Sequence, residues 1–194
     1  MSPEAGSSST TSESLARSWW LMATRGGFAL VFGGLLLAWS EPTLSIVVTL
    51  FGAYAVLDGL WALGAAAWAS RRSVTALAVG LEGLVSLGLG VLALAWPFVP
   101  REFIQLVAGW GVFTGILEIV AAAGMPRETA GHWLLGTAGV CSLFLAVLVL
   151  MVATADVGRA VTVIAGYAMV FGVMVVLAAL RFRSEHPTVA AAAP

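Results

Sequence analysis

Long apolar runs separated by short polar segments dominate this sequence. Six such runs follow one another, and the segments between them contain proline, glycine, arginine and acidic residues. At a rise of 1.5 Å per residue, about 20 helical residues cross the ~30 Å hydrocarbon core of a bilayer. The pattern therefore predicts six transmembrane helices. They cover residues 19–39, 43–68, 74–96, 103–124, 133–153 and 160–180.

The apolar runs also repeat. Tyr54, Trp110 and Tyr167 are spaced by 56 and 57 residues, and each is followed five residues later by a glycine. Arg25 likewise precedes Glu82 by 57 residues, and a glycine follows each of them directly. Self-similarity at a fixed period indicates one supersecondary unit used several times. The unit predicted here is a helix hairpin of about 57 residues, present in three copies.

The period defines the expected organisation of the chain. Three hairpins cover about 19–72, 73–128 and 129–183, between disordered tails at 1–18 and 184–194. Each hairpin crosses the membrane twice, so all three copies keep the same orientation and are related by an axis along the membrane normal. We therefore predict an all-α membrane protein, in which six transmembrane helices form three parallel repeats of a hairpin.

The composition agrees with this prediction. Of the 194 residues, 60% are hydrophobic and only 10% are charged, and the mean hydropathy is +1.01. Soluble domains usually carry about 25% charged residues, so a water-soluble fold is not expected. All nine basic residues are arginine, and they form no basic block of the kind that binds nucleic acid. We expect the lipid bilayer as a partner and no nucleic acid.

The arginines are distributed unequally between the two sides of the predicted bundle. Positive residues accumulate in cytoplasmic loops, so the side that carries more of them is expected to face the cytoplasm. Six against two favours both termini in the cytoplasm. The side of the termini contains Arg17, Arg71, Arg72, Arg127, Arg181 and Arg183, and the other side contains Arg101 and Arg159.

Four ionisable residues lie inside the apolar runs: Arg25, Asp58, Glu82 and Glu118. Each costs about 2.5 to 3.5 kcal/mol at the centre of a membrane helix, so we expect these side chains to face the interior of the bundle. All four lie about two to three helical turns from the cytoplasmic ends of their helices, a depth at which they can meet in one layer. Arg25 and Glu82 occupy equivalent positions of the repeat, which predicts an ion pair between them.

The intramembrane charges do not balance. One arginine against three carboxylates leaves an excess of two negative charges if all four groups are ionised. We expect a proton on at least one carboxylate near neutral pH, because neighbouring like charges and removal from water disfavour the charged form. The third copy has Ala138 at the position of Arg25 and carries no such charge. Two interpretations stay open: a proton-responsive cluster, or fixed ion pairs that only set the register of the helices.

No catalytic or metal-binding motif accompanies these charges. The sequence contains no HExxH, no GxSxG and no phosphate-binding glycine loop. Cys141 is the only cysteine and has no second thiol to pair with in the chain, while His132 and His186 lie in polar segments. We therefore expect no enzymatic activity, no cofactor and no bound metal.

Three related segments carry a resemblance to a known family. FGAYAVLDGLWALG at 51–64 is repeated as VAGWGVFTGILEIV at 107–120 and as IAGYAMVFGVMVVL at 164–177. Together with the Trp19-Trp20 pair and the Arg25-Gly26 that follows it, they make the chain similar to the HdeD-like acid-resistance membrane proteins of bacteria. The resemblance implies a multi-pass protein of the plasma (inner) membrane with a link to acid tolerance. It supplies no active site to transfer.

Three functions follow from these observations as hypotheses. The first is a non-enzymatic membrane protein that contributes to acid or envelope stress tolerance through a charge cluster of Arg25, Asp58, Glu82 and Glu118. The second is a small transporter or channel for ions or a small solute, which would pass between the hairpins. The third is an assembly partner of other membrane proteins. The sequence leaves open whether the chain binds a second copy of itself or another membrane protein.

Overall fold

The computed structural model describes residues 19–39, 43–68, 73–124, 130–153 and 157–190, and these residues form helices with short connections. No strand occurs in these ranges. The expected tail at 1–18 and the last four residues lie outside the described part of the chain. The helices are α2 (Trp19–Ala38), α3 (Leu44–Trp68), α4 (Val74–Ala95), α5 (Pro100–Ala123), α6 (Ala130–Ala153) and α7 (Val157–Ala190).

The helices follow the predicted runs closely, and two of the differences have physical reasons. α5 begins at Pro100 rather than at Phe103, because proline is well tolerated at the first helical position, where its missing N–H has no partner to lose. α7 stays helical to Ala190, whereas the sequence predicts the end of the span near Leu180 and a disordered tail from 184. An apolar pattern locates the part of a helix that lies in the membrane, and not the point where helical backbone ends.

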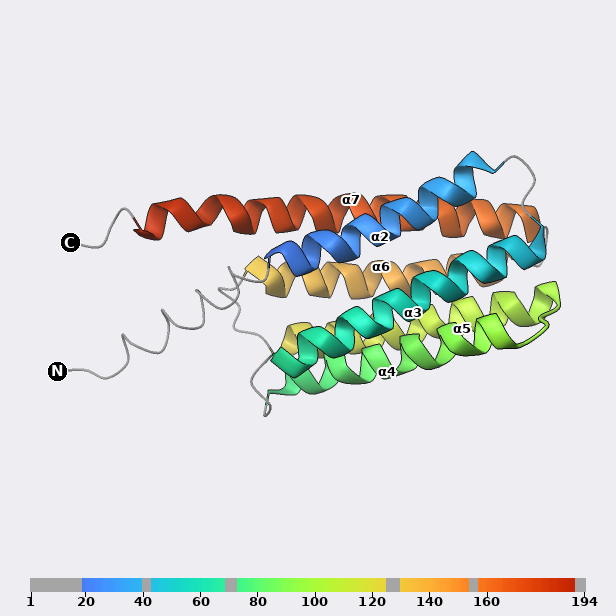
Figure 1. Cartoon of the computed structure of the whole chain (residues 1–194), viewed down its shortest axis with the longest axis horizontal. Helices are drawn as coiled ribbons and strands as arrows, with labels where there is room; N and C mark the ends of the chain where they lie inside the picture. The colour runs from blue at the N-terminus through green and yellow to red at the C-terminus, as the bar shows by residue number, and fades with distance from the viewer. Residues whose placement is uncertain (1–18, 40–42, 69–72, 125–129, 154–156, 191–194) are drawn as a thin grey trace.

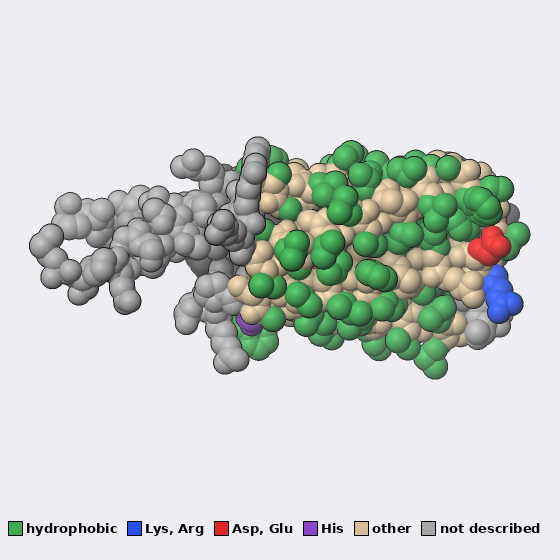
Figure 2. Space-filling view, turned by 90° about the horizontal axis from the view of Figure 1, so that it is seen from below, with side chains coloured by type: hydrophobic (Ala, Val, Ile, Leu, Met, Phe, Trp, Pro, Cys, Tyr) green, Lys and Arg blue, Asp and Glu red, His purple; other side chains and the backbone are tan. Residues whose placement is uncertain are grey.

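The lengths and the surface are those of a multi-pass membrane protein. α3 to α7 each contain a stretch that is long and apolar enough to cross a bilayer, and Ala23–Ala38 of α2 forms a shorter apolar helix. The 20 residues of α2 correspond to ~30 Å of helix, about the thickness of the hydrocarbon core. Hydrophobic side chains cover the outside of the bundle, and the charged side chains visible in Figure 2 lie at one end.

The six helices form a closed ring in which the copies interlock. The most extensive contacts join α3 to α4, α5 to α6, and α7 to α2, so the second helix of each hairpin packs mainly against the first helix of the next hairpin. Contacts within a hairpin are smaller, and they are smallest between α2 and α3. α2 begins and α7 ends at the same end of the bundle (Figure 1). The last copy thus closes on the first, as expected for parallel repeats around one axis.

Glycine pairs bring the backbones together at each of the three large interfaces. In each pair, a Cβ atom added to one glycine would lie 2.6–2.9 Å from the carbonyl oxygen of the other, so the contact requires the missing side chain. Close backbone approach of this kind drives helix association where lipid removes the hydrophobic effect between helices. The pairs are Gly59 with Gly83, Gly115 with Gly139, and Gly172 with Gly26.

The interior is built from layers of equivalent residues, one from each copy. Phe51, Val107 and Ile164 form one buried layer, and Tyr54, Trp110 and Tyr167 form the next one towards the end with the termini. The ring of Trp110 meets those of Phe51 and Tyr54 edge to face, with centroids 5.6 and 6.0 Å apart. Beyond this aromatic layer lies the layer that contains the intramembrane charges.

Candidate functional site

The structure brings all four intramembrane charges together, each from a different helix. Arg25 lies on α2, Asp58 on α3, Glu82 on α4 and Glu118 on α5. Their side chains are almost fully shielded: the relative exposure is 0% for Glu82, 1% for Asp58 and Glu118, and 11% for Arg25. We call these four residues the charge cluster.

A single guanidinium group contacts all three carboxylates. Arg25 Nε donates to Asp58 Oδ1 at 2.8 Å, and Arg25 Nη2 donates to Glu82 Oε1, which is the ion pair predicted from the repeat. The same Nη2 lies 3.3 Å from Glu118 Oε1. Arginine suits this arrangement because its planar fork presents five donors and stays charged in any protein environment. The cluster therefore ties α2 to α3, α4 and α5 through one side chain.

The third copy contributes an aromatic face in place of a charge. Phe171 of α7 occupies the position that corresponds to Asp58, and its ring centroid lies 5.7 Å from Arg25 Cζ. The ring of Trp61 lies 5.6 Å from the same atom. Aromatic rings attract a cation through their quadrupole, so both rings stabilise the guanidinium group. The third copy thus takes part in the cluster without adding a carboxylate.

Two serines that the sequence interpretation missed extend the cluster on either side. Ser86 Oγ donates to Asp58 Oδ2 at 3.2 Å and accepts a hydrogen bond from Trp110 Nε1 at 3.0 Å. The side chain of Ser86 is fully buried. It links the charge layer to the aromatic layer on the side of the second copy.

Ser142 repeats this arrangement one copy later. Its Oγ donates to Glu118 Oε2 at 3.2 Å and lies 2.7 Å from the hydroxyl oxygen of Tyr167. Ser86 and Ser142 are 56 residues apart, which is the spacing of the repeat, and each lies in an apolar run. The two serines could have been identified from the sequence, because both copies have a hydroxyl at the same position of the repeat.

One polar atom of the cluster has no partner. Glu82 Oε2 is buried and makes no hydrogen bond to any residue that the structure describes. A buried oxygen without a partner loses its hydration and gains nothing in return, so such atoms are rare in proteins. With all four groups ionised the cluster has a net charge of −2, from one positive and three negative groups. Negative charge is thus in excess, and Glu82 meets Arg25 through Oε1 alone.

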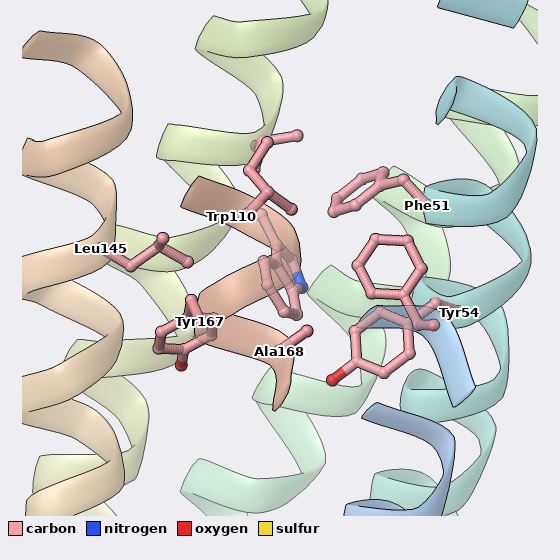
Figure 3. A pocket seen from close by; sticks show the side chains of 9 residues that line it. Phe51, Tyr54, Trp110, Leu145, Tyr167 and Ala168 are labelled. Carbon is pink, nitrogen blue, oxygen red and sulfur yellow. The ribbon is translucent and has the colours of Figure 1, made fainter. Parts of the chain in front are cut away.

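The bundle is closed next to the cluster. Figure 3 shows the aromatic layer, in which Tyr54, Trp110 and Tyr167 converge on a cavity that Phe51 and Leu145 also line. The cavity measures ≈10 Å³, which is at most the space of one water-sized sphere. Bulky aromatic side chains therefore fill the axis here, and this conformation has no room for a file of water molecules at the aromatic layer.

Comparison with known families agrees with the internal repeat. The sequence model of a family described as "Short repeat of unknown function (DUF308)" matches the chain twice in succession, over residues 24–81 and 81–151. The two matches begin 57 residues apart (81 − 24), which is the spacing of Arg25 and Glu82. Neither the curated proteins nor the solved structures contain a significant match to this chain.

Proposed function

The chain belongs to the DUF308 short-repeat family, whose description assigns no activity, and we therefore propose its function from the charge cluster. We propose a non-enzymatic, multi-pass membrane protein that contributes to acid or envelope stress tolerance. In this proposal the cluster takes up protons when the surroundings become acidic, and the packing of the bundle changes in response. The observation that carries it is the contact of one buried arginine with three buried carboxylates.

The charge balance supports proton uptake by the cluster. Two uncompensated negative charges at membrane depth are expensive, and the binding of protons neutralises them. Arg25 Nη2 faces both Glu82 Oε1 and Glu118 Oε1, so these two carboxylates share one donor. Their environment also includes Asp58 and, through Ser142, the hydroxyl group of Tyr167. Protonation would weaken the attraction of Arg25 for α4 and α5 and would leave the contact with α3.

The biological setting is proposed from the resemblance and from the arginine distribution. The likeness to HdeD-like proteins supports a role in acid tolerance and a position in the plasma (inner) membrane of a bacterium. The excess of arginine on the side of the termini supports an orientation with both termini in the cytoplasm. In that orientation, the charge cluster lies in the half of the membrane that faces the cytoplasm.

A survival assay with neutral isosteres tests the function. Asp58→Asn and Glu82→Gln are combined in bacterial cells that produce the protein, and Glu102→Gln serves as the control because Glu102 is an exposed acid at the start of α5. We expect the double variant to survive acid exposure no better than cells without the protein, and the control to survive as well as wild type. Protein levels are measured in the same cells by immunoblotting.

The outcomes separate the two interpretations of the cluster. Normal protein levels with lost survival support a proton-responsive role. Loss of the protein itself would assign the cluster a purely structural role. Normal levels with normal survival would show that the cluster has no part in acid tolerance.

A further inference from the structure

The hydrogen bonds of Ser86 can point in only one direction. Trp110 carries an indole N–H, which donates and never accepts, and Ser86 Oγ accepts it at 3.0 Å. The single hydrogen of Ser86 is then directed to Asp58 Oδ2 at 3.2 Å. A proton on Asp58 Oδ2 would need Ser86 as its acceptor, and the hydrogen of Ser86 would then lose its own acceptor. Because a buried donor without a partner costs free energy, these hydrogen bonds hold Asp58 in its ionised form.

The equivalent hydrogen bonds of Ser142 can be reversed. Ser142 and Tyr167 both carry a hydroxyl group, which donates one hydrogen bond and also accepts. Their oxygens lie 2.7 Å apart and either can be the donor, while Ser142 Oγ lies 3.2 Å from Glu118 Oε2. With Glu118 ionised, Tyr167 donates to Ser142 and Ser142 donates to Glu118. With Glu118 protonated, Glu118 donates to Ser142 and Ser142 donates to Tyr167, so both hydrogen bonds persist.

The two chains of hydrogen bonds also end differently. Reversal leaves the hydrogen of Tyr167 as the last donor of its chain, and Tyr167 is half-buried in the aromatic layer shown in Figure 3. At Asp58 the corresponding donor would be the hydroxyl group of Ser86, which is 0% exposed. Only a buried donor bears the full cost of lost hydration, so reversal costs less at Tyr167 than at Ser86.

Glu118 is also the carboxylate that Arg25 holds least closely. Arg25 forms hydrogen bonds to Asp58 and to Glu82 Oε1, whereas its Nη2 meets Glu118 Oε1 as a charge contact at 3.3 Å. The other oxygen of Glu82 is buried and has no hydrogen-bond partner among the described residues, so a proton there would have no acceptor. Glu118 Oε2 has its acceptor in Ser142. A proton on Glu118 therefore breaks no hydrogen bond to Arg25 and is itself hydrogen-bonded.

We propose that Glu118 takes up the first proton of the charge cluster, and that Ser142 and Tyr167 are positioning residues that stabilise its protonated form. This inference rests on the proposed proton uptake by the cluster and assigns that uptake to one atom. The proton joins Glu118 Oε2, no other covalent bond changes, and the net charge of the cluster goes from −2 to −1. Arg25 keeps its two hydrogen bonds and its place in the bundle.

Charged and titratable groups from five helices surround Glu118 and its hydroxyl chain. Only the two other carboxylates compete with Glu118 for the proton, so the test compares these three residues. The surrounding groups are Arg25 on α2, Tyr54 and Asp58 on α3, Glu82 on α4, Cys141 on α6 and Tyr167 on α7.

Infrared difference spectroscopy tests the assignment, because a protonated carboxyl group has a C=O band that a carboxylate lacks. The full chain is reconstituted in lipid vesicles and titrated from alkaline to acidic buffer. We expect one band to appear before those of the exposed acids, and Glu118→Gln to remove it. Asp58→Asn and Glu82→Gln should keep the band at its frequency and shift it to lower pH, because one negative charge is gone. Glu102→Gln, at an exposed acid, should leave it unchanged.

Tyr167→Phe tests the hydroxyl chain, and Tyr54→Phe at the equivalent position of the first copy is the matched control. Without the Tyr167 hydroxyl group, protonation of Glu118 leaves the hydrogen of Ser142 without an acceptor. We therefore expect the band to require a proton concentration about tenfold higher, the equivalent of one lost hydrogen bond. Tyr54→Phe should leave the titration as in wild type. Ser142→Ala should move the band to higher frequency, because the carboxyl group loses its acceptor, and Ser86→Ala should not.

The outcomes separate this inference from the proposed function. Loss of the first band in Asp58→Asn or Glu82→Gln, but not in Glu118→Gln, would overturn the assignment and leave proton uptake by the cluster in place. An unchanged titration in Tyr167→Phe would overturn the role of the hydroxyl chain. A titration without any such band would overturn proton uptake itself, and with it the proposed function.

Isotopic labelling of wild-type protein adds a test that does not depend on the folding of any variant. Glutamate with a heavy isotope in its side-chain carboxyl group is incorporated, and the same titration is repeated. We expect the first band to shift in frequency, as the band of a glutamate does. A first band that does not shift would belong to an aspartate and would overturn the assignment to Glu118.

Discussion

The charge layer and the buried layer of Val47, Phe103 and Ala160 lie towards opposite ends of the same axis and depart from threefold symmetry in the same copy. In the charge layer, the third copy has Ala138 where the first two have Arg25 and Glu82. In the layer of Val47 and Phe103, the third copy has Ala160. The first difference leaves the charges to the first two copies, and the second leaves only a methyl group in the share of the third copy. The repeat thus supplies a symmetric backbone, and its unequal side chains create two different environments.

The glycine interfaces show how the symmetric part is maintained. Each large interface has its reciprocal glycine pair regardless of whether charges, a hydroxyl or aromatic rings lie beside it. Asp58, Thr114 and Phe171 each directly precede one of these glycines. Side chains next to the glycines can therefore differ between copies while the helices keep the same approach. Chemistry that depends on particular side chains is to be sought where the copies differ.

Removal of Arg25 should cause the largest loss of stability, because Arg25 is the one cation of the charge cluster. Arg25→Met leaves three buried carboxylates without their cation, and loss of one partner of a buried ion pair costs about 3–5 kcal/mol. We expect the free energy of unfolding, measured by SDS titration in mixed micelles, to fall by about this amount. Arg101→Met is the control, since Arg101 is exposed at the start of α5. Equal unfolding curves for the two variants would mean that the ion pairs do not stabilise the bundle.

Substitution of the glycines at the three large interfaces should cause the next largest loss of stability. It tests the helix packing that all three copies share. In Gly59→Ala the new Cβ would lie 2.5 Å from the backbone N of Leu87, and in Gly115→Ala and Gly172→Ala it would lie 2.7 Å from its nearest neighbour. Overpacking of this kind costs about 1–3 kcal/mol. Because the three interfaces are equivalent, we expect similar losses of stability in the same titration.

A glycine of α3 that faces open space provides the control for this series. A Cβ at Gly64 has no neighbour within 4 Å, so Gly64→Ala should leave the unfolding curve unchanged or slightly more stable. A loss at only one of the three interfaces would show that the copies do not share one packing geometry.

Substitution of the two serines should cause the smallest loss of stability. It tests whether the second and third copies contribute equally to the polar network. Ser86→Ala and Ser142→Ala each remove hydrogen bonds to a carboxylate and to an aromatic side chain, and hydrogen bonds in membrane proteins contribute about 0.6 kcal/mol on average. We expect similar small losses for the two variants, although only Ser142 belongs to the copy without charges. Thr137→Ala is the control, because Thr137 is exposed and bonds to its own helix. A loss in Ser86→Ala alone would confine the polar network to the first two copies.

The sequence was sufficient for the helices, the repeat and the charged residues, for identifiable reasons. Hydropathy reports how deep a residue lies along the membrane normal, so the six runs and the common depth of Arg25, Asp58, Glu82 and Glu118 could be read directly. Spacing relates equivalent residues, so the pair of Arg25 with Glu82 could be named in advance. What these patterns do not report is the direction in which a side chain points around its helix.

The features that were missed all depend on that direction. Lipid is as apolar as the interior of the bundle, so little contrast separates the inner face of a helix from its outer face. The stronger packing between hairpins than within them and the hydrogen bonds of Ser86 and Ser142 could not be predicted for this reason. The repeat offered a partial substitute, since comparison of equivalent positions locates the two serines.

The closure of the ring by α7 has a consequence for the order of assembly in the cell. α2 is the first of the six helices to leave the ribosome, but its main packing partner, α7, is the last. During synthesis α2 therefore waits beside α3, with which it makes only a small contact, while the rest of the chain is inserted. Asp58 and Glu82 are synthesised well before α7, so two of the partners of Arg25 are available to the first helix before the ring can close.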